Sequence, residues 1–175
     1  MAISALVSNS PLEPRIISPG KIPMIIHGMG EASGQVYNAG AILKNSAGTS
    51  NQCEAALTSA NDMGAITLLG IALKDATGTT NTAAPCLVPD FDSEVYIKAS
   101  TNGTAVDITS TLFPIGDGFD IYVDGSGHQT LNSATESNAK LQVIGYIYDA
   151  TGALTQWLRC RPVPATWCAL SGAIS

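Results

Sequence analysis

Short segments in which apolar and polar residues alternate recur along most of the chain. The clearest is Lys140–Asp149, KLQVIGYIYD. A period of two is typical of a β-strand with one face against a core. It predicts that Leu141, Val143, Gly145 and Ile147 point to one side and that Gln142, Ile144, Tyr146 and Tyr148 point to the other.

Turn-forming residues separate these segments. Asn, Asp and Gly, which tolerate the left-handed backbone of tight turns, cluster at Asn45–Gly48, Asp124–Gly127 and Ala150–Ala153. Together with a first strand at Met24–His27, they predict roughly eight to ten short strands. The fold class is therefore predicted to be all-β, a small β-barrel or sandwich of short antiparallel strands.

One segment could be either a helix or a strand. Asn51 followed by Glu54 resembles a helix capping box, and CEAALTSAN follows as a short candidate helix. This stretch has no apolar stripe at helical spacing, so we expect a strand that runs into a loop.

An extended, proline-rich arm precedes these strands. Ser10–Pro23 contains four prolines in fourteen residues, which excludes a helix or a central strand. The arm is also apolar, which predicts that it lies along its own domain or along a neighbouring subunit. We divide the chain into an arm with a glycine-rich loop (1–34) and a β-domain (35–175). The arm residues expected to contact a partner are Ile16, Ile17 and Ile22.

Two tryptophans are further candidate contact residues. Trp157 and Trp167 are predicted as exposed aromatic anchors for a partner, with membership of the core as the alternative, because tryptophan is highly buried on average.

Charge excludes several classes of partner. Only 13% of the 175 residues are charged, and the net charge of −6 argues against nucleic acid. Arg159 and Arg161 share one strand face, a spacing typical of a solvated or salt-bridged face.

The longest apolar run, Ile66–Leu73, is far shorter than the roughly 20 residues of a membrane span. The first residues lack the pattern of a signal peptide, so we expect a soluble protein made in a cytoplasm.

The four cysteines form no C-x-x-C pair. Cys53, Cys86, Cys160 and Cys168 are expected to be free buried thiols, and a disulfide between Cys160 and Cys168 stays open.

Residues for catalysis are scarce. The two histidines, His27 and His128, lie beside turns, and no G-x-S-x-G motif accompanies them. Asp117, Asp120 and Asp124 lack the spacing of a calcium loop and are interpreted as turn formers. We therefore expect no enzyme, no catalytic residue, no cofactor, no metal and no small-molecule substrate.

The order of segments from Gln35 to Trp167 carries a family resemblance. It runs through AGAILKNSAG, LLGIALKDA, APCLVPD, EVYIKAS and FDIYVDGSGHQTL to VIGYIYD and WLRCRPVPATW. This order resembles the small β-barrel head decoration (cement, or capsid-stabilising) proteins of tailed bacteriophages. The resemblance implies a virion protein on the capsid surface, often a homotrimer, that bridges major capsid protein subunits. The alternative is a carbohydrate-binding, fibre or tail module of a virion.

Overall fold

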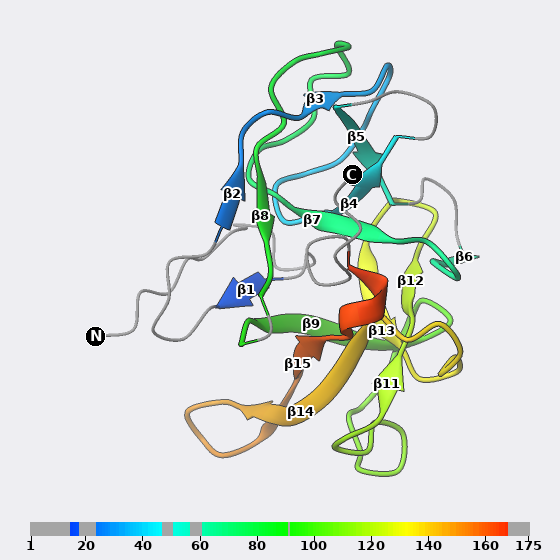
Figure 1. Cartoon of the computed structure of the whole chain (residues 1–175). Coiled ribbons are helices and arrows are strands. Elements are labelled where there is room, and N and C mark those ends of the chain that lie inside the picture. Colours follow the sequence, from blue (N-terminus) through cyan, green and yellow to red (C-terminus); the bar gives the residue numbers. More distant parts are fainter. Residues whose placement is uncertain (1–14, 18–23, 47–50, 57–60, 91, 168–175) are drawn as a thin grey trace.

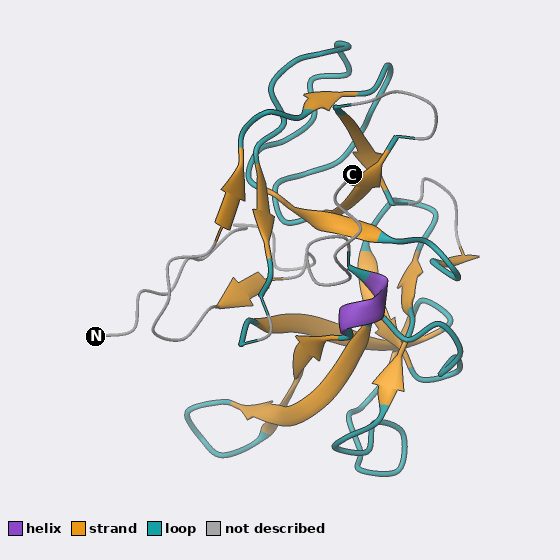
Figure 2. Ribbon diagram, in the orientation of Figure 1, coloured by secondary structure: helices purple, strands orange, loops and turns teal. Residues whose placement is uncertain are grey.

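The chain folds into two β-sheets. The computed structural model describes residues 15–17, 24–46, 51–56, 61–90 and 92–167. Within these ranges it contains fifteen strands and a single turn of 3-10 helix (Figure 2), so the predicted all-β barrel or sandwich class is confirmed. None of these segments forms a helix with the length and apolar character that crossing a membrane requires.

The smaller sheet lies in the upper half of Figure 1 and curls on itself. Its six described strands follow the order β2-β8-β7-β4-β5-β3. Their bounds are β2 (Met24–Ile26), β3 (Gly30–Glu31), β4 (Ile42–Asn45), β5 (Gln52–Ala55), β7 (Leu68–Ala72) and β8 (Cys86–Val88). A bridge joins Gly30 to Ala83, just before β8, so β3 meets the segment that leads into β8. Gly30 permits this approach, because a Cβ there would lie 2.8 Å from the Cα of Asn81.

The larger sheet forms the lower half of the molecule (Figure 1). Its nine described strands follow the path β11-β14-β15-β9-β13-β12-β6, and β1 and β10 also pair with β9. Their bounds are β1 (Arg15–Ile17), β6 (Asn61–Asp62), β9 (Glu94–Thr101), β10 (Thr104–Ala105), β11 (Gly118–Phe119), β12 (Ile121–Val123), β13 (Gln129–Asn132), β14 (Leu141–Tyr148) and β15 (Leu154–Pro162), and the 3-10 turn η1 (Pro164–Thr166) follows β15. The described pairings are antiparallel except β13 with β9 and β3 with β5.

The main core lies between the two sheets. It joins Ile42, Leu68, Ile71 and Leu87 of the smaller sheet to the inward residues of β9 and β15, among them Val95, Ile97, Leu158 and Cys160. A second cluster, which includes Tyr37, Leu43, Cys53, Leu69 and Cys86, belongs to the other side of the smaller sheet. The smaller sheet therefore has apolar residues packed on both of its faces.

A buried glutamine connects the sheets by hydrogen bonds. Gln129 in β13 accepts a hydrogen bond from the backbone N–H of Ile42 in β4 (2.7 Å) and donates one to the carbonyl of the same residue (3.2 Å). Because Gln129 is only 1% exposed, the backbone N–H of Ile42 depends on this side chain, whereas the carbonyl of Ile42 also accepts a hydrogen bond from the N–H of Ala56 (3.2 Å).

A β-bulge changes the predicted alternation of β14. Val143 pairs with Cys160, but Gly145 pairs with Arg159, so Ile144 is an extra residue. Beyond the bulge, Tyr146 lies opposite Leu158 on the inward side and its hydroxyl donates to the carbonyl of Phe113 (2.9 Å). The prediction that Tyr146 lies on the opposite side from Val143 is therefore wrong.

Two other expectations can be compared with the strands. Gln52–Ala55 is strand β5, so the expected strand is confirmed over the capping-box helix. Residues 24–34, assigned to the arm and its loop, contribute β2 and β3 to the smaller sheet, so sheet formation begins before residue 35.

Candidate binding surface

The arm residues Ile16 and Ile17 belong to β1, whose backbone pairs with β9 of the same chain. Ile16 lies opposite Val95, and Ile17 opposite Glu94. At this strand, the arm therefore lies along its own domain, one of the two alternatives. Ile22, the third predicted contact residue of the arm, lies outside the described residues.

Trp167 is a core residue. Its side chain is fully buried (0% exposed), and its indole N–H donates to the carbonyl of Lys140 (3.0 Å). The expectation of an exposed anchor is wrong here, because η1 turns the chain after β15 and Trp167 bridges to Leu68 of the smaller sheet.

Trp157, in contrast, is half-buried and lies on the outward face of the larger sheet. In β15 it is paired with Lys98 of β9, while the next pair, Leu158 and Ile97, points into the core. The Lys98 ammonium lies 5.6 Å from the centre of the indole ring, within range of a cation–π interaction.

Arg159 continues the same outward face. It donates from Nε and Nη2 to the two carboxylate oxygens of Glu94 (2.8 and 2.5 Å), and the hydroxyl of Tyr96 donates to Glu94 as well (2.9 Å). Burial alone would raise the pKa of Glu94, but the hydrogen bonds from Arg159 and Tyr96 outweigh it and lower that pKa. The hydrogen bond to Glu94 raises the pKa of Arg159. The predicted salt-bridged strand face is confirmed.

Arg161 lies on this face too, but its environment differs. It is paired with Gln142 of β14, and its Nε donates to the Gln142 side-chain oxygen (2.6 Å). We call the outward residues of β9, β14 and β15 the open sheet face: Glu94, Tyr96, Lys98, Gln142, Trp157, Arg159 and Arg161. Sequence reasoning identified Trp157 and the two arginines of this face but missed its β9 members. The alternation in EVYIKAS was a signal that could have found them.

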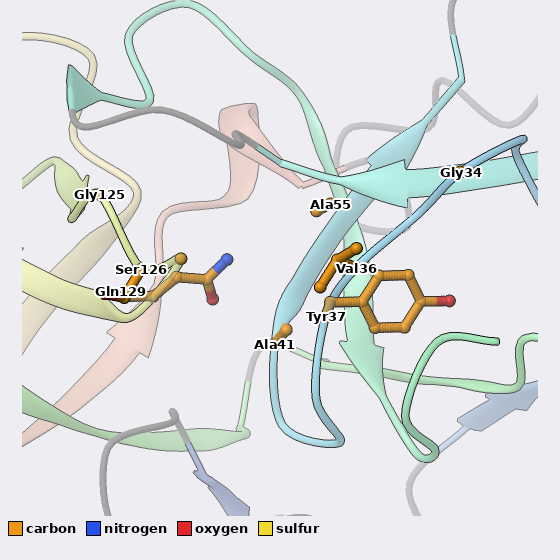
Figure 3. Close-up of a pocket in the computed structure, with 9 residues that line it drawn as sticks. Gly34, Val36, Tyr37, Ala41, Ala55, Gly125, Ser126 and Gln129 are labelled. Carbon is orange, nitrogen blue, oxygen red and sulfur yellow. The ribbon is translucent and has the colours of Figure 1, made fainter. Parts of the chain in front are cut away.

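A second surface feature is a hollow of about 440 Å³ at the boundary between the sheets (Figure 3). It lies between the loop before β4, which includes Val36 and Tyr37, and the turn Gly125–Gly127. Figure 3 shows the Tyr37 hydroxyl directed away from Gln129. The Gln129 amide is already bonded to Ile42, and this hollow is interpreted as part of the junction between the sheets.

Buried charges beside β6 have structural partners. The Asp120 carboxylate, 0% exposed, accepts hydrogen bonds from the N–H groups of Gly64 and Ile121 (both 2.7 Å). Lys140 donates to the carbonyls of Gly64 and Asn138. Burial raises the pKa of Asp120 and lowers that of Lys140. The interpretation of Asp120 as a turn former is wrong, because it fixes a distant segment of chain.

Asp124 behaves as predicted. Its carboxylate accepts hydrogen bonds from the N–H groups of Ser126 (2.8 Å) and His128 (2.9 Å), and so it stabilises the turn between β12 and β13. The His128 ring lies 2.9 Å from the same carboxylate, so this histidine is held in the turn.

The described cysteines are free thiols. Cys53, Cys86 and Cys160 are buried and unpaired, as expected, and Cys168 lies outside the described residues. Burial raises the pKa of Cys160. A hydrogen bond with Cys53, together with burial, raises the pKa of Cys86. Among the described residues, no group of three or more His, Cys, Asp or Glu side chains could hold a metal ion.

No protein-family model matches the chain, and no curated protein matches it in sequence.

Proposed function

We propose that this chain is a structural protein of a tailed-phage virion, which docks on the outside of the capsid and bridges major capsid protein subunits. The resemblance in segment order supports this proposal, and so does the open sheet face. In this reading the protein works by binding, as a homotrimer, without a catalytic step or cofactor.

The composition of the open sheet face is the observation that carries the proposal. Tryptophan, tyrosine and arginine, the residue types that dominate the energetic centres of protein interfaces, lie side by side there as Trp157, Tyr96 and Arg159. Their positions are fixed by the pairing of β9 with β15 and by the bidentate bond of Arg159 to Glu94. A surface that is ordered before binding loses less side-chain entropy when a partner docks.

Charge adds to this argument. The chain carries a net charge of −6, yet Lys98 and Arg161 make no ion pair with any acidic side chain of the described residues. This face is therefore more positive than the protein as a whole. It suits a partner with an acidic surface, which would be attracted at long range and aligned on contact.

The test is docking to capsids. Purified protein is added to expanded capsids that lack it, and bound copies are counted by sedimentation and quantitative mass spectrometry. Saturable binding of hundreds of copies per capsid is expected, and Trp157→Ala should weaken it by about tenfold or more. Absence of binding by the wild-type protein would overturn the proposal.

A carbohydrate-binding module is the second candidate, favoured by the half-buried Trp157 in the open sheet face. Sugars stack on the flat face of an aromatic ring, and Lys98 lies over that ring here. We therefore rank this function below capsid docking. Selective binding on a glycan array that is lost in Trp157→Ala would reverse the ranking.

A further inference from the structure

At one end of the open sheet face lies a hollow of about 700 Å³, where β11 joins β14. Arg161, Gln142, Gly118, Ala139, Pro162 and Asp92 are among the residues that line it. Gly118 and Ala139 are small and lie close together, because a Cβ at Gly118 would be only 2.8 Å from that of Ala139.

A relay of hydrogen bonds holds Arg161 in place. Its Nε donates to the oxygen of the Gln142 amide (2.6 Å), and the nitrogen of that amide donates to the carbonyl of Gly116. Gly116 is in turn fixed by donating its N–H to the carbonyl of Val143 (2.9 Å). These hydrogen bonds restrict the side-chain torsions of Arg161 and the backbone of the loop at Gly116.

The charge of Arg161 is not neutralised within the described chain. Arg159, two residues before it in β15, has both carboxylate oxygens of Glu94 as partners. Arg161 has only a neutral amide, and within the described residues its two terminal nitrogens have no hydrogen-bond or ion-pair partner. A guanidinium held by one edge has its other donors available to a ligand.

We propose that this hollow is a carboxylate-binding site, which takes an aspartate or glutamate side chain of the partner polypeptide against Arg161. A guanidinium presents a planar fork of N–H donors that matches the two oxygens of a carboxylate. Asp92, which also lines the hollow, repels a doubly charged phosphate more strongly than a singly charged carboxylate, which favours the acidic side chain. The identity of the partner as a capsid subunit rests on the proposed function, but the site itself does not.

The site can be tested on the isolated protein with a blocked peptide. Acetyl-Ala-Glu-Ala-amide is titrated while the backbone amide signals of Gln142, Arg161 and Gly118 are followed by two-dimensional NMR. Saturable shifts confined to these signals are expected, and the Gln counterpart of the peptide should produce none. Arg161→Gln should weaken binding about tenfold or more, because charge-assisted hydrogen bonds are lost.

Two further variants control for charge and for positioning. Lys74→Gln removes an exposed positive charge outside the open sheet face, and it should leave the titration unchanged. Gln142→Leu keeps the Arg161 charge but removes the relay, and binding should weaken several-fold. NMR spectra that overlay outside the hollow will show that each variant is folded.

Several results would overturn the inference. These are equal shifts with the Gln peptide, inorganic phosphate that binds as tightly as the Glu peptide, or wild-type binding by Arg161→Gln. The peptide titration separates this site from the proposed function. If the protein binds the peptide but does not dock on capsids, only the proposed function is contradicted. If Arg161→Gln docks as well as the wild type and the wild type does not bind the peptide, only the carboxylate site is contradicted.

Discussion

The two sheets differ in what covers their faces. All five residues of β7 and all three of β8 in the smaller sheet are buried. In the larger sheet, β9 and β15 alternate between buried residues and residues that are partly or fully exposed. Among the described residues, apolar side chains pack on both sides of the smaller sheet, whereas those of the larger sheet pack on one side.

This difference limits which residue types each sheet can carry. Residues of the smaller sheet are constrained by close packing on both sides, where almost any change of volume is unfavourable. The outward residues of β9 and β15 have no such constraint, so arginine, lysine and tryptophan can lie there without disturbing the core. The smaller sheet is therefore the packed scaffold, and the outward face of the larger sheet carries the residues that we propose for partner binding.

The largest effect is expected from truncating a buried residue of the smaller sheet. Ile71→Ala, at a position that is 0% exposed, should lower the free energy of unfolding by about 2–5 kcal/mol, because it leaves a cavity in the core. Leu154→Ala, at the end of the β14–β15 hairpin where the side chain is 45% exposed, should change it by less than about 0.5 kcal/mol. Urea denaturation followed by tryptophan fluorescence measures both, and equal losses would contradict the comparison.

A pair of glycines tests the same contrast at the backbone. A Cβ at Gly70 in β7 would lie 2.6 Å from the carbonyl oxygen of Leu87, whereas at Gly145 in β14 the nearest atom, Cδ of Arg159, is 3.9 Å away. Gly70→Ala should therefore cost about 1–3 kcal/mol of stability through overpacking. Gly145→Ala should have an effect of less than about 0.5 kcal/mol. Thermal unfolding of the two variants side by side gives the answer, and a destabilised Gly145→Ala with an unaffected Gly70→Ala would refute it.

Much of this architecture could be predicted from local patterns. Alternation and turn chemistry predicted the all-β class, the turn at Asp124 and the strand at Gln52–Ala55, because these features depend on neighbouring residues. The faces of Arg159 and Arg161 also followed from strand periodicity.

Features that depend on distant residues could not be predicted in this way. The bulge at Ile144 moves Tyr146 to the inward side, and nothing in the local pattern indicates the extra residue. The burial of Trp167 depends on its bridge to Leu68 in the other sheet. Likewise, Arg159 and Arg161 look equivalent in the sequence, and only the position of Glu94 on β9 distinguishes them.

The junction between the sheets should respond less strongly than the core of either. Gln129→Met preserves most of the side-chain volume but leaves the N–H of Ile42 without its partner, while the carbonyl of Ile42 keeps its bond from the N–H of Ala56. Because only one backbone group loses its partner, the loss should lie at the lower end of about 1–3 kcal/mol. Gln156→Met, at an exposed position of β15, is the matched control. A loss no greater than in this control would show that the two hydrogen bonds do not hold the sheets together.

The smallest effect is expected on the open sheet face itself, where two arginines can be compared. The pKa of Glu94 is lowered in the folded protein, so its bond to Arg159 stabilises the fold above the ordinary carboxylate pKa and is lost as the pH falls through the folded value. Because the Arg159 side chain is 45% exposed to solvent, Arg159→Gln should cost at most about 1 kcal/mol at pH 7. The difference from wild type should shrink at pH 3 and in high salt, as denaturation curves under each condition would reveal.

Arg161 has no carboxylate partner among the described residues, so the small effect of Arg161→Gln on stability should not depend on pH. If both variants show the same pH dependence, the two arginines are equivalent, and the free charge on which the carboxylate site depends is not specific to Arg161.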